Sequence, residues 1–574
     1  MTHAYLACLA GPERPEPVPP TLLAALARLG CVRRPGPERV RLFATDDLPA
    51  RSAASGEGLV IGHLFDRSGN PAGPDVPLTL SRDGVRAMTR RLWGSYVAIG
   101  VHGERILAAR DPSGGLACYH TQIGGVTYFT SVPHLLVECG LLAAELDWAQ
   151  VVRALVHHSE RKAETAIQGI RELLPGTLVT VDGHRSETCP VWDPWDHASA
   201  SPPNDPAETL RQTLLSTLAA WGHSFDRPLV EISGGLDSAI VAAGLAPATR
   251  SASLITFAAA PGDPDETAYA RALAGHLGLP LEVATPRAEH VDLARSLSSD
   301  HPRPNARAFT QAADAESLRH ARAIGANAFV SGGGGDDVFC YLRTVLPAVD
   351  RFRAQGLGPM LSTAMDIAVM NHSTLWDALA RVVRRLVRRG PARRPLDLRF
   401  IAPGIGDAVA AASDRRPDDR PPGKAAHVRG VMTIHNYLEG HARAAFAPIL
   451  SPLLSQPVVE CCLAIPSWHW CAGGRNRAVA REAVRGLLPP VVLERRSKGC
   501  FDGFCAALLE TNRALVGAML LDGRLAAHGL LDREAVERAL TDPALPAESV
   551  ARLLALVDVE SWVAGWAARP AQRS

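Results

Sequence analysis

Leu229-Val-Glu-Ile-Ser-Gly-Gly-Leu-Asp-Ser238 is the stretch that decides the fold of this chain. Four residues with strand character lead directly into a Ser-Gly-Gly-Leu-Asp-Ser turn, and a small-residue run with helical character follows. A turn at a helix N-terminus presents unpaired backbone N–H groups and the positive end of the helix dipole, which suits a polyphosphate. No Gly-Lys-Ser/Thr closes the turn, so it is not the common phosphate-binding loop. The alternative interpretation is a glycine turn between two buried elements.

A second glycine cluster, Phe329-Val-Ser-Gly-Gly-Gly-Gly-Asp-Asp-Val-Phe339, also follows an expected strand. Ligands of open parallel sheets bind at the carboxyl ends of the strands, so we expect the two turns to face one nucleotide. Mg²⁺ bound to a triphosphate takes one or two protein carboxylates, which Asp237 and Asp336 are placed to supply. The sequence therefore predicts a site for ATP and Mg²⁺. The residues expected to bind the nucleotide are Ser233, Gly234, Gly235, Leu236, Asp237, Ser238, Phe257, Ser331 and Gly332. Ser238, in the first helical turn, is interpreted mainly as a helix N-cap.

The sequence pattern divides the chain into a β-rich first part and an α/β second part. In the first part, short strands separated by glycine turns predict an antiparallel meander over Gly94–Val101, Arg105–Arg110, Leu116–His120 and Val126–Thr130. After a proline-bearing linker at Asp196–Pro206, strands and helices alternate, which predicts a parallel sheet covered on both faces. The expected strands are Leu229–Ile232, Ser253–Phe257, Leu281–Ala284 and Ala328–Val330, with helices from Ser238, over Glu266–Leu277 and over Ala312–Ile324. Beyond about residue 345 the pattern is mainly helical. We expect two domains, residues 1–195 and 207–574, with an α+β and then an α/β arrangement.

The composition limits the classes of protein that this chain can belong to. At 574 residues it is too long for one core, so two or three domains are expected. The net charge of +1 argues against a protein that binds nucleic acid through broad electrostatics. Eleven cysteines without a Cys-x-x-Cys pair indicate free thiols in a reducing compartment. No signal peptide is evident and no apolar run reaches membrane-spanning length, so we expect a cytoplasmic protein without a membrane span.

The segment from Leu375 to Arg394 has apolar residues at helical spacing and seven arginines between Arg381 and Arg394. This pattern predicts an amphipathic helix whose basic face lies in solvent. A second interpretation is a docking surface for an acidic peptide or a partner protein.

The motifs together resemble those of the asparagine synthetase superfamily of ATP pyrophosphatases. Ser233–Ser238 is similar to the ATP loop of that family, and Ser331–Asp337 to its Ser-Gly-x-Gly-x-Asp-Glu motif. Asp265–Gly278 resembles the helix after the family's second strand, and Leu488–Gly499 resembles the segment that carries its catalytic lysine. This implies that Lys498 is a catalytic residue together with Arg477 and Asp237, and that ATP is cut between its α and β phosphates.

The first part resembles the glutaminase-like domain of the same superfamily. Arg110-Asp-Pro-Ser-Gly114 and Gly169–Gly176 are similar to landmarks of that domain. This implies an N-terminal antiparallel β-sandwich with helices, ahead of a parallel-sheet ATP pyrophosphatase domain with a helical extension. However, Thr2 stands where a glutaminase of the family carries its nucleophilic cysteine, and Ile61–Phe65 replaces the glutamine-binding Asn-Gly-Glu stretch. We therefore expect a retained scaffold that makes no ammonia.

Departures in the second part change the expected substrate. Gly333 stands where asparagine synthetases carry a glutamate proposed as base, and Arg477 where relatives commonly have lysine. An arginine remains cationic and can pair bidentately with pyrophosphate. A peptide α-amine has a pKa of about 8, so roughly a tenth is neutral at pH 7 without a base. The loss of the glutamate is therefore tolerable if the nucleophile is an N-terminal amine.

With these departures, the chain resembles the lasso peptide cyclases. The resemblance rests also on Gly523–Asp532, on Ser331–Tyr341 and on Ser451-Pro-Leu-Leu-Ser-Gln-Pro457. It implies an enzyme that adenylates an Asp or Glu side chain of a leaderless precursor peptide, whose own N-terminal amine then closes a macrolactam. The implied partners are the precursor peptide, a leader peptidase and a leader-binding protein.

Three alternatives remain open. A β-lactam synthetase, or an asparagine synthetase-like ligase, acts on a small molecule; β-lactam synthetases of the family carry tyrosine at the position of Gly333. A tRNA-modifying ATP pyrophosphatase shares the first motif, but it lacks the first domain and is expected to be more basic. A catalytically inactive binding scaffold is disfavoured because Ser233–Ser238, Asp336 and Lys498 are all retained.

Overall fold

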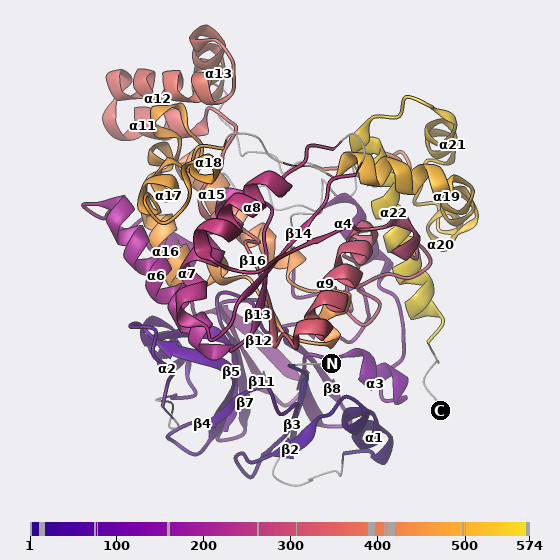
Figure 1. Cartoon of the computed structure of the whole chain (residues 1–574). Coiled ribbons are helices and arrows are strands. Elements are labelled where there is room, and N and C mark those ends of the chain that lie inside the picture. Colours follow the sequence, from indigo (N-terminus) through magenta and orange to yellow (C-terminus); the bar gives the residue numbers. More distant parts are fainter. Residues whose placement is uncertain are drawn as a thin grey trace.

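Three β-sheets organise the chain: two antiparallel sheets at one end and a parallel sheet in the middle of the molecule (Figure 1). The computed structural model describes residues 3–10, 18–73, 76, 78–157, 161–260, 263–305, 307–387, 396–406, 409, 420–495, 499 and 501–569. Both antiparallel sheets are drawn from residues up to Pro190, and the parallel sheet begins at Pro228. This is the α+β and then α/β layout that the sequence pattern predicts.

The two antiparallel sheets have six strands each and pack face to face. The first has the order β10-β8-β9-β1-β3-β2 and consists of β1 (Tyr5–Ala10), β2 (Val32–Arg34), β3 (Val40–Ala44), β8 (Tyr119–Ile123), β9 (Val126–Thr130) and β10 (Arg171–Glu172). The second has the order β12-β11-β7-β6-β5-β4 and consists of β4 (Ala50–Ser52), β5 (Gly58–Asp66), β6 (Leu92–His102), β7 (Arg105–Arg110), β11 (Thr177–Asp182) and β12 (Arg185–Pro190). One apolar core joins them, with Tyr5, Leu42 and Phe129 from the first sheet against Ile61, Val97 and Val179 from the second. The helices of this part are α1 (Pro20–Arg28), α2 (Arg82–Arg91), α3 (His134–Glu138), α4 (Trp148–Val156) and α5 (Pro194–Ala198).

The predicted meander is confirmed in β6, β7 and β9 and is displaced in β8. The strand expected at Leu116–His120 lies instead at Tyr119–Ile123. It forms a hairpin with β9, in which Ile123 pairs with Val126 across a two-residue Gly124-Gly125 turn. Because that tight turn sets the register, the strand continues through the polar Thr121 and Gln122, which apolar alternation alone does not mark as strand.

The parallel sheet has the order β15-β14-β13-β16-β17, and every neighbouring pair is parallel. Its strands are β13 (Pro228–Glu231), β14 (Ser253–Phe257), β15 (Leu281–Ala284), β16 (Ala328–Ser331) and β17 (Ile449–Leu450). The helices α7 (Leu236–Leu245), α8 (Thr267–Leu277) and α9 (Gln311–Ile324) connect the first four strands, close to the predicted ranges. The fifth strand was not expected, because two residues within a long helical region are too few for a periodic pattern.

Alternate residues of the strands face the two covered sides of this sheet. Val230, Leu254 and Val330 belong to a core that includes residues of α6 (Pro206–Ser224), α7 and α8. On the other side, Leu229 and Phe329 pack with Ala321 of α9. The α6 helix begins where Asp205, at the end of the predicted linker, accepts hydrogen bonds from the backbone N–H groups of Ala207 and Glu208. The beginning of that predicted linker is helical, because α5 runs to Ala198.

Among the described residues after β16, the regular elements are helices apart from β17. These helices are α10 (Gly335–Val338), α11 (Leu346–Gln355), α12 (Leu357–Met370), α13 (Leu375–Val387), α15 (Pro422–Ile434), α16 (Gln456–Ala464), α17 (Ala478–Ala483), α18 (Pro490–Leu493), α19 (Asp502–Asp522), α20 (Arg524–Ala527), α21 (Arg533–Thr541) and α22 (Ala547–Ala567). In Figure 1, α11 to α13 form one lobe at the upper left, and α19 to α22 form another at the upper right.

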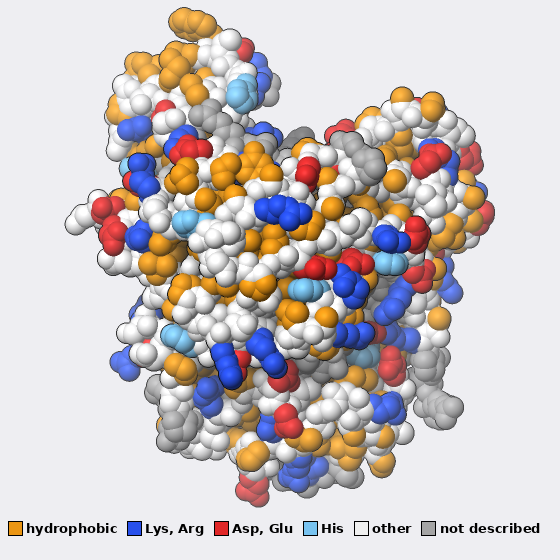
Figure 2. All heavy atoms as spheres, viewed as in Figure 1, with side chains coloured by type: hydrophobic (Ala, Val, Ile, Leu, Met, Phe, Trp, Pro, Cys, Tyr) orange, Lys and Arg blue, Asp and Glu red, His pale blue; other side chains and the backbone are white. Residues whose placement is uncertain are grey.

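The helix expected from Leu375 is present as α13, and residues 388–395 of the basic segment lie outside the described residues. Val382 is buried, but Trp376 is 78% exposed and Val387 is 75% exposed. Figure 2 shows hydrophobic side chains at the surface of this lobe. The apolar face of α13 is thus only partly covered by the described part of the chain.

The helix α19 and its continuation to Ala527 are long and apolar enough to cross a membrane by length and composition. The expectation that no apolar run reaches that length is therefore wrong by this criterion. Leu508, Leu509 and Val516 of α19 are buried in one core with residues of α22. A helix in the core of a water-soluble protein passes the same test, so this observation is weak evidence for a membrane span.

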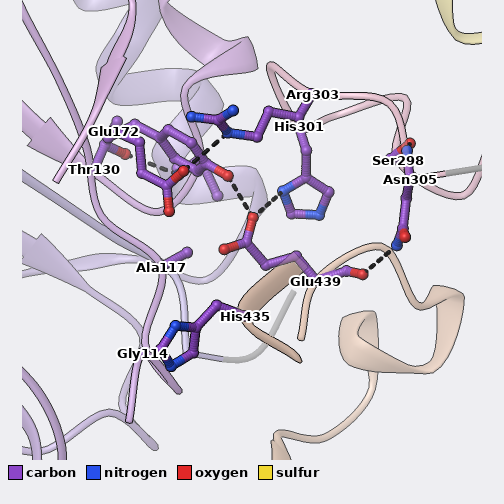
Figure 3. A network of polar contacts seen from close by, with 12 residues as sticks. Gly114, Ala117, Thr130, Glu172, Ser298, His301, Arg303, Asn305, His435 and Glu439 are labelled. Carbon is purple, nitrogen blue, oxygen red and sulfur yellow. Dashed lines mark hydrogen bonds and ion pairs between the residues drawn. The ribbon is translucent and has the colours of Figure 1, made fainter. Parts of the chain in front are cut away.

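Buried charges join the first antiparallel sheet to the second half of the chain (Figure 3). Glu172, on β10, accepts hydrogen bonds from Arg110 Nη1 at 2.8 Å, Arg161 Nε at 2.8 Å and Arg303 Nε at 2.9 Å. Arg303 lies before α9, so this one carboxylate connects the two parts of the chain. The side chain of Glu172 is fully buried, and that of Arg110 is 1% exposed.

Glu439, which follows α15, is a carboxylate of the second half of the chain that bonds to residues of the first half. Arg161 Nη2 donates to its carboxylate at 2.9 Å, and the Tyr119 hydroxyl of β8 donates to the other oxygen. Burial alone would raise the pKa of the Glu439 carboxyl, but the nearby cations, Arg161 first among them, lower it to about 2. The pKa of Glu172 is lowered as well, by Arg161, Arg303 and Arg110 against the effect of burial. Both carboxylates are therefore charged at neutral pH.

Replacing Glu172 with Gln should lower the free energy of unfolding by about 3–5 kcal/mol, because three guanidinium groups lose a buried carboxylate. Urea denaturation at pH 7 measures this change. The matched control is Glu164→Gln, which removes an exposed partner of Arg171 and should cost less than about 1 kcal/mol.

The contribution of Glu172 to the free energy of unfolding depends on pH. A carboxyl whose pKa is lowered in the folded state stabilises the protein above its unfolded pKa, about 4.3 for Glu. That contribution is lost as the pH falls towards the lowered value, so the difference between the parent and Glu172→Gln should shrink below about pH 4. Equal stability of Glu172→Gln and Glu164→Gln at pH 7 would contradict the structural role of this network.

Candidate nucleotide-binding site

The two glycine turns predicted to share a nucleotide follow adjacent strands of the parallel sheet. β13 and β16 are hydrogen-bonded neighbours, with Val230 opposite Val330 and Glu231 opposite Ser331. β13 is the first strand of this sheet in the sequence, and the chain adds strands on both of its sides. In such open sheets the ligand crevice lies at the carboxyl ends of the strands, where the strand order reverses. Both turns lie at this place.

The turns touch each other through their backbones. A Cβ atom added to Gly332 would lie 2.5 Å from the backbone nitrogen of Ser238, and one added to Gly335 would lie 2.5 Å from Cγ of Asp237. Side chains at these positions would force the two turns apart. The glycines of the second turn therefore allow Asp237 and Asp336 to lie in one small region, which sequence spacing alone did not determine.

The first turn has the form that its sequence predicts. Gly235 is the N-cap residue of α7, and Leu236 is buried in the core, so only the backbone of Leu236 is available to a ligand. Gly234 has a φ of 62°, in the left-handed region, where a side chain would also meet Cβ of Tyr269 at 2.5 Å. The turn thus presents backbone groups at the N-terminus of α7, as an anion site requires.

Ser238 differs from the sequence-based interpretation. It is not the N-cap but lies three residues after it, and its Oγ accepts a hydrogen bond from the backbone N–H of Ser233 at 3.2 Å. This bond closes the turn on itself. The hydroxyl of Ser238 therefore shapes the loop whether or not it also contacts a phosphate.

Asp237 and Asp336, the two expected metal ligands, are brought together by an arginine. Arg477 Nη1 donates to Asp237 Oδ2 at 2.7 Å and to Asp336 Oδ1 at 2.8 Å. The donor set fits a divalent cation, because two carboxylates from two different elements converge on one positive group. The same contacts mean that Arg477 pairs with the two carboxylates expected to bind the metal, whereas its sequence position predicts a pairing with pyrophosphate.

The backbone of Arg477 is itself unusual. Its φ is 53°, in the left-handed region, and it precedes the first residue of α17. For a residue other than glycine this conformation costs of the order of 1–3 kcal/mol and is concentrated at functional sites. The guanidinium also lies over the ring of Tyr341, 5.3 Å from its centroid. This conformation places Arg477 between the two turns.

Lys498 lies outside the described residues, but the described residues on either side of it, Arg495 and Gly499, both bond to Glu266, and Arg495 also bonds to the first turn. Arg495 Nη1 donates to the backbone carbonyl of Ser233 at 3.1 Å and forms an ion pair with Glu266. Glu266 also accepts a hydrogen bond from the backbone N–H of Gly499 at 2.8 Å. The segment expected to carry the lysine is therefore attached beside the phosphate turn on each side of residues 496–498.

Arg495 and Glu266 were not predicted as site residues. Arg495 lies in Leu488–Gly499 and Glu266 in Asp265–Gly278, two segments that resemble motifs of the family. The opposite charges of these two residues were the sequence signal that could have indicated them. The remaining expected residues are placed at strand ends: Phe257 ends β14 and is partly buried, and Ser331 ends β16. The structure gives no contact that tests Phe257 as a nucleotide ligand.

Comparison with known proteins gives a match to one family model that covers more than half of the chain. A family model described as asparagine synthase matches residues 209–564. Among solved structures, glutamine phosphoribosylpyrophosphate (PRPP) amidotransferase from B. subtilis, complexed with ADP and GMP, is 10% identical over 50% of this chain and 83% of that chain, with a TM-score of 0.21. The allosteric regulatory enzyme of purine biosynthesis is 9% identical over 51% and 77%, with a TM-score of 0.20. These two likenesses are too low to carry an argument. No curated protein matches the chain.

Gly332→Ala should destabilise the protein by about 1–3 kcal/mol, because the added methyl group would push the two turns apart. Urea denaturation measures the loss. Gly275→Ala is the matched control, since this glycine lies within α8 with no atom within 4 Å of an added Cβ, and alanine there should stabilise the helix by about 0.5–1 kcal/mol. If the two variants were equally stable, the close packing of the turns would be refuted.

Arg477→Met should increase the affinity of the protein for Mn²⁺, a probe for Mg²⁺, in the absence of nucleotide. Arg477 then no longer competes with the ion for the two carboxylates, so we expect a gain of at least about tenfold. Titration followed by electron paramagnetic resonance measures free Mn²⁺. Arg477→Lys, which keeps the charge, should stay close to the parent, and adding Asp336→Asn should abolish the gain. Equal Mn²⁺ affinity of the parent and Arg477→Met would exclude this competition.

Proposed function

The chain belongs to the asparagine synthase family, and from this premise we propose that it is an ATP-dependent cyclase that closes a macrolactam ring in a leaderless lasso precursor peptide. Membership in the family makes it an ATP-dependent ligase that forms amide bonds. The cyclase proposal goes further, to the substrate that supplies both the carboxylate and the amine.

The observation that carries the proposal is the difference between Gly333 and the glycines on either side of it. Packing demands Gly332, as shown above, and Gly334 has a φ of 85° with Leu454 in the way of a Cβ. Gly333 is exposed and has an ordinary φ, and a Cβ there would meet only the hydroxyls of Ser331 and Ser451, at 3.1 Å and 3.4 Å. A larger residue therefore requires only that the Ser331 hydroxyl moves by a few tenths of an ångström. We interpret its absence as room for a bulky acceptor beside the nucleotide.

In the first proposed step, an Asp or Glu carboxylate of the peptide attacks the α phosphorus of ATP. The new bond joins the carboxylate oxygen to phosphorus, the bond to the β phosphate breaks, and pyrophosphate leaves. The backbone N–H groups of the Ser233–Ser238 turn hold the leaving phosphates, and Lys498 stabilises the charge that develops on them. Mg²⁺, held by Asp237 and Asp336, would neutralise phosphate charge when bound. Arg477 is then released from these carboxylates and can pair with the pyrophosphate.

In the second proposed step, the N-terminal amine of the same peptide attacks the activated carbonyl carbon. The amide C–N bond forms, the bond from carbon to the AMP oxygen breaks, and the amine loses a proton to solvent. No side chain at position 333 acts as base, and a neutral fraction of roughly a tenth at pH 7 is sufficient for an α-amine held in place. A tethered, well-oriented amine has an effective concentration of the order of 10⁵ M or more.

In this proposal the first domain makes no ammonia. Thr2 lies outside the described residues. The argument against a glutaminase nucleophile rests on its identity, because threonine stands in place of cysteine. The amine then comes from the peptide and not from glutamine. The proposed partners are the precursor peptide, a peptidase that removes its leader and a protein that binds the leader.

The proposal predicts that a leaderless peptide with N-terminal glycine and an acidic residue several positions later loses one water when incubated with the protein, ATP and Mg²⁺. Its N-terminus should then resist Edman degradation, because the amine is in the ring. Mass spectrometry measures both. The same peptide with an acetylated N-terminus should be adenylated but not cyclised. Dehydration of the acetylated peptide, or amide formation only with ammonia or a free amino acid, would contradict the cyclase assignment.

Gly333→Tyr distinguishes an effect on peptide cyclisation from an effect on the reaction with the nucleotide. The variant should fold, since the position is exposed, and it should keep adenylation of a small carboxylic acid while its rate of peptide cyclisation falls at least about tenfold. Gly275→Ala again serves as the control with unchanged activity. Unchanged cyclisation by Gly333→Tyr would remove the argument from this glycine.

A further inference from the structure

Three segments that are far apart in the sequence meet at the short helix α3. The helix itself contributes His134 and Glu138, the segment before α9 contributes Asp300, and Arg569 follows the end of α22. In Figure 1 the C-terminal end of α22 runs down to α3. Both halves of the chain therefore contribute side chains to this place, and none of these residues belongs to the candidate nucleotide-binding site.

His134, Glu138 and Asp300 form a group of potential metal ligands. One ring nitrogen of the histidine and one carboxylate oxygen of each acid all lie within 4.8 Å of one another. His134 and Glu138 are four residues apart in α3, so their side chains leave the same face of the helix. Two ligands at this spacing are a recurring element of metal sites built on helices. Asp300 comes from a different segment and completes a set of three.

The ring of His134 has a polar atom without a partner. The residue is only 6% exposed, and its Nδ1 is buried without a hydrogen-bond partner among the described residues. Buried polar atoms are normally paired, and a bound water or ion is a common explanation when they are not. A neutral imidazole has one nitrogen with a free lone pair, which is the atom that binds a metal ion. The unpaired nitrogen is thus evidence for a ligand that is separate from the proximity of the two acids.

The backbone at Asp300 is held in place by α22. The carbonyl of the next residue, His301, accepts hydrogen bonds from the indole nitrogens of Trp562 and Trp566, at 2.9 Å and 3.1 Å. Both indole rings are buried in the core that α22 shares with α19. The position of Asp300 opposite α3 is therefore fixed by the packing of the second half of the chain.

The side chains of the two acids have room to adjust around an ion. The side chain of Glu138 is 43% exposed and that of Asp300 is 44% exposed. In a tetrahedral site with metal–ligand bonds of about 2.0–2.2 Å, the ligand atoms lie roughly 3.4 Å apart. Rotations that move the carboxylate oxygens by about one ångström are sufficient to reach that separation. The group needs no movement of the backbone to close on a metal ion.

Arg569 contacts the same two acids but leaves part of their acceptor capacity. Its Nη2 lies 2.9 Å from Oδ1 of Asp300 and 3.5 Å from Oε1 of Glu138. A carboxylate has two oxygens with about four lone-pair sites, so one such contact does not exhaust it. The two acids and Arg569 together carry one net negative charge, which favours a further cation.

We propose that His134, Glu138 and Asp300 bind one divalent transition-metal ion, and that Zn²⁺ is the ion that this donor set fits best. Zn²⁺ accepts imidazole nitrogen together with carboxylate oxygen, whereas Mg²⁺ and Ca²⁺ take oxygen ligands. Water completes the coordination shell. The ion joins α3 of the first half to the segment that also supplies Arg303 to the buried charge network. Its role is structural, and the proposal does not depend on the proposed cyclase activity.

The test is isothermal titration of Zn²⁺ into the reduced full chain, with Asp336→Asn in every variant so that the candidate nucleotide site does not contribute. We expect one bound Zn²⁺ per chain. Loss of partners outside the ligand shell already lowers metal affinity about 10–100-fold, so Glu138→Gln and His134→Gln should each lower it at least tenfold. Glu138 is half-exposed, so its variant should fold normally. His102→Gln is the matched control, since it removes an exposed histidine of the first half that pairs with Glu57.

Thermal unfolding gives a second measurement and verifies that each variant is folded. Zn²⁺ should raise the Tm of the Asp336→Asn parent and of the control, but not of Glu138→Gln, because the ion binds the folded arrangement. Blocking the accessible cysteine thiols with N-ethylmaleimide should leave Zn²⁺ binding unchanged.

Four outcomes would overturn the proposal. They are absence of Zn²⁺ binding to the parent, equal affinity in Glu138→Gln and His102→Gln, loss of binding after the thiols are blocked, and stabilisation by Mg²⁺ equal to that by Zn²⁺. The last outcome would indicate a site made of carboxylates without the imidazole. Failure of the peptide to lose water would count against the cyclase alone, since Zn²⁺ binding is measured without turnover.

Discussion

The direct backbone contact between the two glycine turns is the constraint on which the candidate site depends. β13 and β16 are neighbours in a parallel sheet, so the turns that follow them emerge at the same edge. Only glycine at positions 332 and 335 lets the second turn lie against Ser238 and Asp237 of the first. This contact brings two carboxylates to one point, where the guanidinium of Arg477 pairs with both of them. The backbone of the candidate site is therefore set by the packing of the two turns.

The second main feature of the structure is the buried charge network between the halves of the chain. The first part of the chain supplies Arg110, Arg161 and Glu172 to a buried network that reaches Arg303 and Glu439. Breaking such a network by removing one partner is costly, because the remaining charges stay buried.

Features set by short stretches of sequence were predictable, and features set by contacts distant in sequence were not. The turn after β13, the βα alternation and the hairpin strand β9 follow from local patterns, and the structure has them close to the expected residues. β8 was displaced because a two-glycine turn sets its register, and β17 was missed because it has two residues. The bridge from Arg477 to Asp237 spans 240 residues, and that from Arg303 to Glu172 spans 131. Periodicity carries no information about such pairs, so the contact of Arg477 with Asp237 and Asp336, and the contacts of Arg495 and Glu266 beside the first turn, became visible only in the structure.

The central claim is that the paired turns hold ATP for cleavage between its α and β phosphates. Exchange of radiolabelled pyrophosphate into ATP tests it most directly, because exchange requires reversible cleavage at that bond and does not need ring closure. With Mg²⁺ and an N-acetylated acidic peptide, the account predicts exchange in the parent and none in Asp237→Asn or Asp336→Asn. Formation of ADP and orthophosphate without exchange would contradict it.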